Sequence, residues 1–316
     1  MVLEIKNLTL SVLTEYGYID VVEGLSFNID EGEIYGLVGE SGCGKTVTAL
    51  SVLRLLSKSF RVKSGSILFC GENIFSIPEK DLGRIRGREI SIVFQEPMTS
   101  LNPVIKIGEQ IEEMFIVHLG MERKMAKQKS IEVLEEVGFG NPERTFHQYP
   151  HQLSGGQRQR VLIAMAISLG PKLIICDEPT TALDVASERE VLDILLNLVE
   201  RRRVSMLFIT HNLHIVERLC HRIGIMYLGR LVEEQKKESF FSNPLHPYSQ
   251  GLLSSALMKG EKLRPIRGNV PELRNIPEGC KFHPRCDLVM DICRTKEPKV
   301  VGKERESWVR CFLYGS

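Results

Sequence analysis

The sequence lacks a dominant charge and any long apolar run. Its 41 basic and 40 acidic residues leave a formal net charge of +1, whereas nucleic-acid-binding proteins usually carry a marked basic excess. The most apolar stretch, residues 161–176, is followed closely by charged and polar positions and is interrupted by Gly170-Pro171-Lys172. A membrane-spanning helix needs about 18 apolar residues in a row. We therefore expect neither a nucleic-acid partner nor a membrane-spanning segment.

Internal repeats, low-complexity tracts and a secretion signal are also missing. Residues 1–6 alternate like a strand and do not have the basic and then apolar composition of a signal peptide. Of the 316 residues, 43% are hydrophobic and 26% are charged, which is ordinary for a soluble globular protein of one large or two modest domains. The expected compartment is the cytoplasm.

A phosphate-binding loop is the most specific motif that is present. Residues 39–46 read GESGCGKT and fit the pattern G-x-x-x-x-G-K-[ST], in which backbone N–H groups surround phosphates and the lysine reaches the outer ones. The loop joins an expected strand at 33–38 to an expected helix at 47–53, whose N-terminal dipole favours phosphate. The residues expected to bind the nucleotide are Gly39, Ser41, Gly42, Cys43, Gly44, Lys45, Thr46 and Val47.

Two adjacent acids follow a continuous apolar run at 173–176, which is typical of a buried parallel strand. A carboxylate at the end of this strand, Asp177, can hold Mg²⁺ directly or through water, and the hydroxyl of Thr46 can also bind the ion. The next carboxylate, Glu178, can orient and deprotonate a water in line with the γ-phosphate. These residue types predict a nucleotide hydrolase.

Changes in periodicity divide the chain into four parts. Strand-like segments with turns fill residues 1 to about 95, helical spacing follows between about 103 and 150, and helices alternate with apolar strands from 153 to about 229. From residue 243, prolines, charges and clustered cysteines replace the periodicity. We predict an α/β fold: a phosphate-loop ATPase core with an antiparallel β subdomain, an inserted helical subdomain at about 96–160, and a small C-terminal cysteine-bearing extension. The expected domain boundaries are 1–240 for the ATPase domain and 241–316 for the extension.

Together with the segment at 153–157, LSGGQ, these motifs resemble the nucleotide-binding subunits of ATP-binding-cassette (ABC) transporters over most of residues 1–235. In that family two subunits sandwich two ATP molecules head to tail, and each phosphate loop faces the other subunit's signature segment. The resemblance implies that the signature segment acts in trans on the partner's ATP and that Asp184 lies across the interface. The signature residues are Ser154, Gly155, Gly156 and Gln157.

The resemblance also implies roles for single residues. Tyr16 would stack on adenine, with Tyr18 as the alternative, because an aromatic face adds stacking energy. Gln95 would sense Mg²⁺ and the attacking water. His211, directly after an expected core strand, resembles the switch histidine that contacts the γ-phosphate. The implied catalytic residues are Glu178, His211 and Gln95, and the implied magnesium site consists of Thr46, Gln95 and Asp177.

Segments at 96–103, 243–249 and 264–286 resemble the dipeptide/oligopeptide permease ATPases more narrowly. This resemblance implies that ATP-driven dimerisation energises an importer of di- or oligopeptides at the cytoplasmic face of the cell membrane. The implied partners are two transmembrane permease subunits, a second and paralogous ATPase subunit, and an extracytoplasmic peptide-binding protein. Nickel or oligosaccharide cargo is one alternative, and a soluble cassette ATPase acting on nucleic acid or ribosomes is another.

Eight cysteines are present, and four of them crowd the C-terminal end with five, six and seventeen intervening residues. These spacings differ from the tight pairs of common structural zinc sites, whereas tetrathiolate iron–sulfur ligation tolerates them. We predict a [4Fe–4S] cluster, with a zinc site or four unlinked thiols as alternatives. The ligands would be Cys280, Cys286, Cys293 and Cys311.

Cys43 stands where many members of the resembled family carry serine. A thiol at a helix N-terminus has a lowered pKa, so we expect Cys43 to make the enzyme sensitive to thiol reagents.

Overall fold

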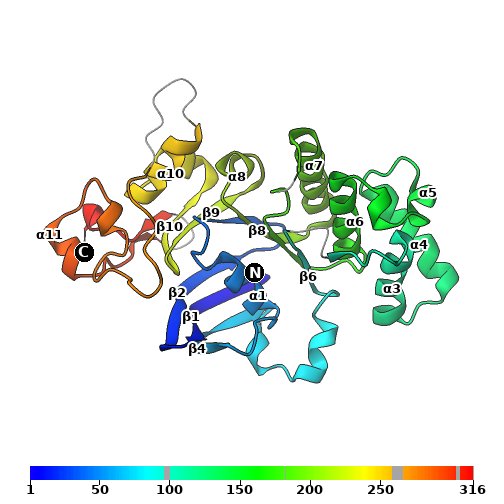
Figure 1. Ribbon diagram of the computed structural model, residues 1–316, viewed down its shortest axis with the longest axis horizontal. Coiled ribbons are helices and arrows are strands. Elements are labelled where there is room, and N and C mark those ends of the chain that lie inside the picture. The colour runs from blue at the N-terminus through cyan, green and yellow to red at the C-terminus, as the bar shows by residue number, and fades with distance from the viewer. Residues whose placement is uncertain (96–99, 182, 258–265, 304–306, 316) are drawn as a thin grey trace.

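The computed structural model describes residues 1–95, 100–181, 183–257, 266–303 and 307–315. Parts of two segments used above, residues 96–99 and 264–265, lie outside these ranges. Within them the chain forms two sheets, and helices cover the larger sheet (Figure 1). This arrangement confirms the predicted α/β fold class. None of the helices in the described ranges is long and apolar enough to cross a membrane.

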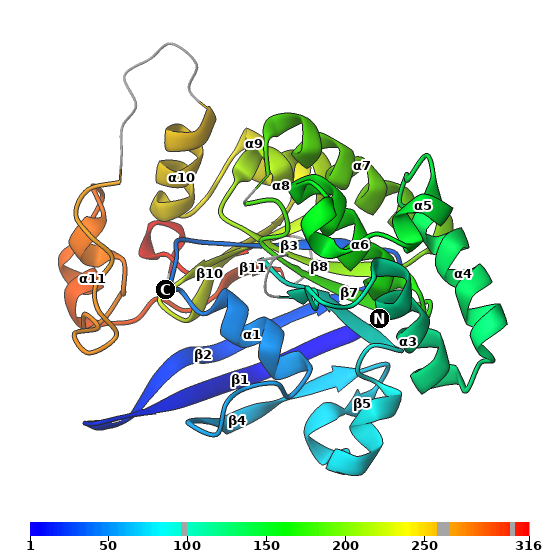
Figure 2. The same cartoon turned by 45° about the vertical axis from the view of Figure 1, so that its right-hand side comes forward.

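The smaller sheet is the antiparallel subdomain, with strand order β2-β1-β4-β5. Its strands are β1 (Leu3–Thr14), β2 (Gly17–Ile29), β4 (Phe60–Phe69) and β5 (Glu72–Asn73). In the register of β1, Leu3 lies opposite Ile29 of β2 and Phe69 of β4. The sheet forms a layer beneath α1 (Lys45–Val52) in Figure 2.

The larger sheet carries the nucleotide core, with strand order β11-β12-β10-β9-β3-β8-β7-β6 in the described residues. Strands β6, β7, β8, β3 and β9 pair in parallel, and β10 pairs antiparallel with β9. Because the carboxyl ends of parallel strands open on one edge, the loops after β3, β7 and β8 come together there. The bounds are β3 (Ile34–Val38), β6 (Ile90–Val93), β7 (Leu173–Asp177), β8 (Ser205–Thr210), β9 (Arg222–Tyr227) and β10 (Arg230–Lys236).

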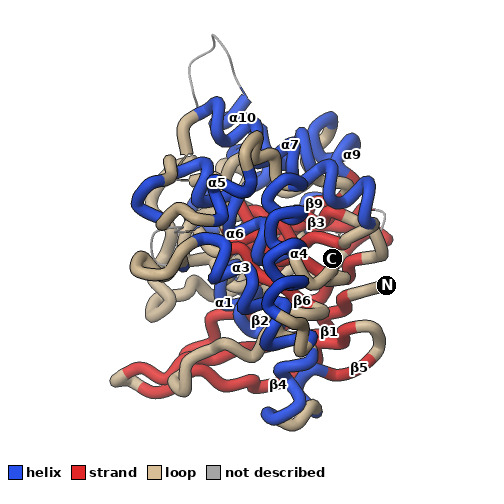
Figure 3. Tube along the Cα trace, turned by 90° about the vertical axis from the view of Figure 1, so that its right-hand side faces the viewer, coloured by secondary structure: helices blue, strands red, loops and turns tan. Residues whose placement is uncertain are grey.

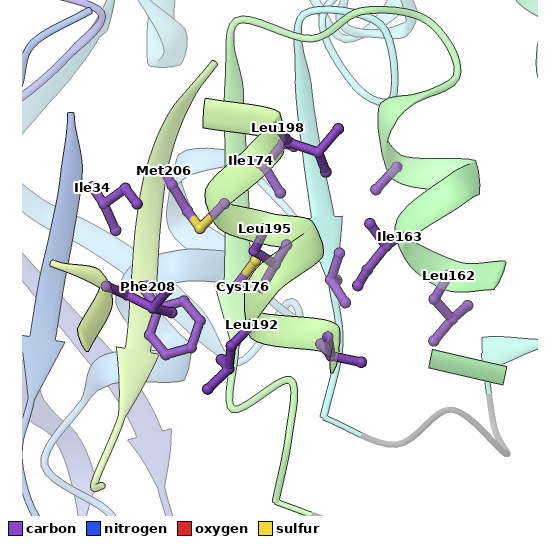
Figure 4. Packing of buried hydrophobic residues seen from close by; sticks show 14 of the residues in the cluster. Ile34, Leu162, Ile163, Ile174, Cys176, Leu192, Leu195, Leu198, Met206 and Phe208 are labelled. Atoms are coloured by element: carbon purple, nitrogen blue, oxygen red, sulfur yellow. The ribbon is translucent and has the colours of Figure 1, made fainter. Parts of the chain in front are cut away.

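Three helices, α6 (Gly155–Ile167), α7 (Val185–Arg202) and α8 (Leu213–Leu219), pack on this sheet. Leu192, Leu195 and Leu198 recur at helical spacing along α7 and are buried. They belong to the same buried cluster as Cys176 of β7 and Met206 of β8, part of which is drawn in Figure 4. This apolar contact fixes the two strands whose ends carry the predicted catalytic residues.

Helices α3 (Ile107–Leu119), α4 (Arg123–Glu136) and α5 (Pro142–Phe146) lie within the range expected for the inserted helical subdomain. They form one end of the molecule in Figure 1 and face the viewer in Figure 3. Gly108 of α3 lies so close to the Phe146 ring that a Cβ atom there would come within 2.1 Å of it. Short 3₁₀ turns lie at Ile74–Ser76, Glu79–Arg84, Pro150–Gln152, His283–Arg285 and Phe312–Tyr314.

The C-terminal extension joins the sheet and the core of the ATPase. Strand β12 pairs antiparallel with β10, where Trp308 lies opposite Glu234. Tyr248 and Phe282 belong to the same buried cluster as the residues of β7 and α7. The boundary at residue 241 stays a prediction. The extension's elements and the helix before it are α9 (Lys237–Ser242), α10 (Pro247–Leu257), α11 (Asp291–Thr295), β11 (Val301–Lys303) and β12 (Ser307–Val309).

Candidate functional site

The phosphate loop turns sharply between β3 and α1. Gly42 and Gly44 have φ angles of 79° and 106°, a region that strains residues with a side chain. At Gly39 an added Cβ would lie 2.2 Å from the carbonyl oxygen of Met226. The glycines of the motif are therefore required by the path of the backbone, and this path directs the start of α1 towards the loop.

Lys45 lies inside the loop and is 5% exposed. Its Nζ donates hydrogen bonds to the carbonyl oxygens of Gly39 (2.7 Å) and Glu40 (3.0 Å). A cation held in this way, beside the N-terminus of α1, gives the loop the electrostatics of an anion site.

The structure contradicts the expectation that Cys43 has a lowered thiol pKa. The residue is 2% exposed, and burial raises the pKa of its thiol, although the nearby Lys45 opposes this shift. The predicted lowering of the pKa is therefore wrong, because loss of solvation outweighs the helix N-terminus and the lysine.

Thr46, Asp177 and Gln95 line one cleft of about 690 Å³. Asp177 is 6% exposed. Burial raises its pKa, and a hydrogen bond from the Thr46 side chain opposes that shift. Among the described residues, the Oδ1 atom of Asp177 is buried without a hydrogen-bond partner. A buried, unpartnered carboxylate oxygen beside a hydroxyl and an amide fits the oxygen ligands that Mg²⁺ prefers.

Glu178 and His211 come together from the ends of β7 and β8. The Oε1 atom of Glu178 lies 3.1 Å from Nδ1 of His211, and its Oε2 atom accepts a hydrogen bond of 3.0 Å from the Thr181 hydroxyl. The backbone of Glu178 has a φ of 48°, which is uncommon for a residue other than glycine. A carboxylate oriented on both sides in this way can position a water molecule. Sequence reasoning missed Thr181, for which the sequence offers no signal.

Helix α6 begins within the signature segment. Ser154 is the N-cap, and its hydroxyl accepts a hydrogen bond of 3.2 Å from the N–H of Gln157. The Gln157 side chain accepts a hydrogen bond of 3.0 Å from the Ser154 N–H, which completes a capping box. Ser154, Gly155 and Gln157 are exposed, whereas Gly156 is buried. The exposed helix start is available to a ligand brought by another molecule.

Asp184 caps the next helix, α7. Its Oδ1 atom accepts hydrogen bonds from the N–H groups of Ala186 (3.1 Å) and Ser187 (3.0 Å), and these bonds lower the pKa of the carboxyl. Ser187 in turn lies against Gly156, where an added Cβ would come within 2.7 Å of it. The capped turn therefore packs against the signature segment, and the interface role of Asp184 stays a prediction.

The two candidate adenine-stacking residues lie in the β1–β2 hairpin. Tyr16 is 74% exposed and has the guanidinium of Arg274 4.9 Å from its ring centroid. Tyr18 is 45% exposed and has that of Arg61 at 3.5 Å. Both rings are accessible, so the assignment of adenine to Tyr16 stays a prediction.

The four C-terminal cysteines are free thiols. The N–H of Cys280 donates a hydrogen bond of 2.9 Å to the carbonyl of Cys293. Burial, with smaller contributions from the other three thiols, raises the pKa of Cys280 to about 11. In the part of the chain that the structure describes, no three His, Cys, Asp or Glu side chains form a group that could hold a metal ion. The side chains as placed do not fit the predicted [4Fe–4S] cluster.

Comparison with known families gives two matches. Residues 22–181 match the family described as ABC transporter. Residues 232–293 match the family described as oligopeptide/dipeptide transporter, C-terminal region.

Individual relatives match over nearly the whole chain. The oligopeptide transport ATP-binding protein AppD of Bacillus subtilis is 46% identical over 99% of this chain and 96% of its own. The dipeptide transport ATP-binding protein DppD of Bacillus subtilis is 39% identical over 99% and 94%. Among solved structures, a dimeric bacterial ABC transporter cassette, MJ0796, covers 74% of this chain and 98% of its own at 27% identity, with a TM-score of 0.67. CbiO1 from Clostridium perfringens, part of the ABC transporter complex cbiONQ, covers 77% and 91% at 25% identity, with a TM-score of 0.66.

Proposed function

The chain belongs to the ABC transporter family, and we propose that it is the ATP-binding subunit that hydrolyses ATP to drive import of di- or oligopeptides. The observation that carries this proposal is the convergence of the strand ends. The Glu178–His211 pair lies at the same edge of the sheet as the carboxyl end of β3, which leads into the phosphate loop with Lys45 and Thr46. An acid, a cation and a metal-binding hydroxyl at one edge are the parts that ATP hydrolysis needs.

Residue roles in the proposed site follow from their positions. Lys45 and the loop N–H groups bind the β- and γ-phosphates. Thr46, Asp177 and Gln95 would hold Mg²⁺, which neutralises charge that develops on the phosphate oxygens. Glu178 accepts a proton from the attacking water, and His211, 3.1 Å away, contacts the γ-phosphate.

A second subunit completes the proposed site. The start of α6 is exposed, and its N–H groups and dipole favour phosphate. The relative MJ0796 is dimeric, and a head-to-tail dimer of this chain, or of this chain with a paralogue, would place the signature segment against the partner's ATP. Closure then requires ATP, and opening follows hydrolysis.

Peptide cargo is supported by the match of the C-terminal region and by the names of the relatives. Neither the nickel nor the oligosaccharide alternative has similar support.

The proposed partners are two transmembrane permease subunits, a second and paralogous ATPase subunit and an extracytoplasmic peptide-binding protein. This subunit would lie at the cytoplasmic face of the membrane. The cleft beside Gln95 is lined by apolar side chains that include the exposed Leu55 and Phe94, and a permease segment would bury them.

The iron–sulfur cluster stays a hypothesis. The described side chains do not support it as placed, because they form no group that could hold a metal ion. Measurement of iron and acid-labile sulfide in anaerobically purified protein decides it. Protein without iron would remove the hypothesis, whereas iron that is lost in Cys286→Ser but kept in Cys70→Ser would support it.

Glu178→Gln tests the ATPase mechanism. It keeps the shape of the side chain but removes the base, so we expect ATP turnover to fall by about 100-fold or more, while ATP binding persists and an ATP-dependent dimer accumulates on size-exclusion chromatography. Glu143→Gln, in an exposed position of α5, is the matched control. Wild-type turnover in Glu178→Gln would contradict the assignment.

The cargo needs a separate test. In the complex purified from solubilised membranes, peptide presented with its binding protein should stimulate ATP hydrolysis, whereas nickel or oligosaccharide should not. Stimulation by one of these two instead would reassign the cargo while leaving the ATPase assignment intact.

A further inference from the structure

Glu40 occupies a variable position of the phosphate-loop motif, yet each of its polar groups has a partner. Its carbonyl oxygen accepts a hydrogen bond of 3.0 Å from Nζ of Lys45. Its N–H donates a hydrogen bond of 3.0 Å to the Tyr248 hydroxyl. Its carboxylate accepts two hydrogen bonds from the guanidinium of Arg285, at 2.6 and 3.0 Å. Two of these three attachments come from the C-terminal extension.

The Arg285 side chain is buried and is held by hydrogen bonds. It is 5% exposed, against 29% for Glu40. Its Nε donates a hydrogen bond of 3.0 Å to the carbonyl of Arg267, so that both edges of the guanidinium are engaged. A bidentate arginine–carboxylate pair fixes orientation as well as distance, and a buried arginine of this kind loses little further entropy when it holds its partner.

Tyr248 is equally fixed. It is fully buried, and its ring packs against Tyr227 and Phe282, with centroids 4.7 and 5.3 Å away. Its own N–H donates a hydrogen bond of 3.0 Å to Nδ1 of His246. The hydroxyl that receives the Glu40 N–H therefore sits on a rigid support.

A second route connects the extension to the same loop. Nζ of Lys281 donates a hydrogen bond of 2.8 Å to the carbonyl of Leu228 in the β9–β10 turn. The next residue of that turn, Gly229, donates its N–H to the carbonyl of Cys43 at 3.0 Å. The extension is therefore connected to the phosphate loop at two places, directly at Glu40 and through the β9–β10 turn at Cys43.

We infer that the C-terminal extension positions the phosphate loop for ATP, and that Arg285 and Tyr248 are positioning residues that act through Glu40. The inference rests on the proposed ATP site. Binding is stronger when the binding groups are held in the bound arrangement beforehand. Release of Glu40 frees the loop and the carbonyl that engages Lys45, so ATP affinity decreases without any change in a residue that touches ATP.

The test is ATP binding by the full-length subunit carrying Arg285→Gln. We expect a dissociation constant about tenfold higher, equivalent to about 1.4 kcal/mol, and we expect Tyr248→Phe to weaken binding severalfold, because it leaves the Glu40 N–H without its acceptor. Arg267→Gln is the matched control, because that side chain is exposed and Arg267 accepts the Arg285 hydrogen bond through its backbone carbonyl. Its affinity should equal that of the wild type.

A double-mutant cycle separates positioning from general loss of stability. In a Glu40→Gln background, Arg285→Gln should change ATP affinity by less than twofold, because the pair is already broken. Full additivity of the two substitutions, or unchanged affinity in both Arg285→Gln and Tyr248→Phe, would overturn the inference. If Arg285→Gln does not fold, Tyr248→Phe decides by itself. Lys45→Ala tests the ATP site separately, since unchanged affinity in that variant would refute the proposed site rather than the role of the extension.

Discussion

Glu23 of β2 holds two cations that come from different parts of the chain. Its carboxylate accepts hydrogen bonds from Nε of Arg230 in β10 (3.1 Å) and from Nζ of Lys281 in the extension (2.7 Å). Burial by itself would raise the pKa of Glu23, but the hydrogen bonds and charges of the two cations outweigh it and lower the pKa from 4.5 to about 2. Glu23→Gln removes the charge and keeps the shape.

The size of the effect follows from this shift. A difference of about 2.5 pKa units corresponds to about 3.4 kcal/mol, but the Glu23 side chain is 33% exposed, and solvent screening reduces the contribution to about 1–2 kcal/mol. Because the folded-state pKa is depressed, this stabilisation is complete above the unfolded pKa of 4.5 and is lost as the pH falls from there towards 2.

Urea unfolding of the wild type and of Glu23→Gln at several pH values tests this reasoning. At pH 7 the variant should be less stable by about 1–2 kcal/mol, with a lower urea midpoint and an unchanged dependence on urea concentration. Between pH 5.5 and 4 the difference in unfolding free energy should begin to shrink. Glu31→Gln, at an exposed position of the β2–β3 turn, is the control and should unfold like the wild type. A difference that stays constant from pH 7 to pH 4 would refute the electrostatic explanation.

Two further predictions concern the nucleotide site. Cys43 should resist alkylation in the folded protein because it is buried and the pKa of its thiol is raised; mass spectrometry should find the exposed Cys70 modified first, and faster labelling of Cys43 would contradict its burial. Gly156→Ala should lower stability by about 1–3 kcal/mol, since its Cβ would lie 2.7 Å from Ser187. In Gly155→Ala the new Cβ meets only ordinary contacts, so its thermal midpoint should match the wild type, and equal midpoints for both variants would disprove the close packing.

The local parts of the fold could be predicted because their signals lie within a few residues. The phosphate loop needs glycines at Gly42 and Gly44 for its left-handed turns, and the run before Asp177 marks a strand buried on both faces. The apolar periodicity alone does not reveal the start of α6, because a capping box formed by Ser154 and Gln157 sets it.

The cysteines show where such reasoning fails. Residue type and position at a helix N-terminus predict a reactive Cys43, but solvation decides its pKa, and burial follows from neighbours that are distant in the sequence. In the same way, the spacing of the C-terminal thiols predicts a cluster, whereas ligand geometry depends on how the extension folds. The described side chains do not form that geometry.

Short continuous patterns in the sequence carry the predicted chemistry of this protein: a phosphate loop, a strand ending in two acids and a signature segment. The contacts between residues that are distant in the sequence depend on the tertiary structure. Parallel pairing of β7 with β8 brings His211 to Glu178, and the packing of the extension brings Arg285 to Glu40. Contacts of this second kind depend on strand order and on burial of the whole chain, which no local pattern encodes.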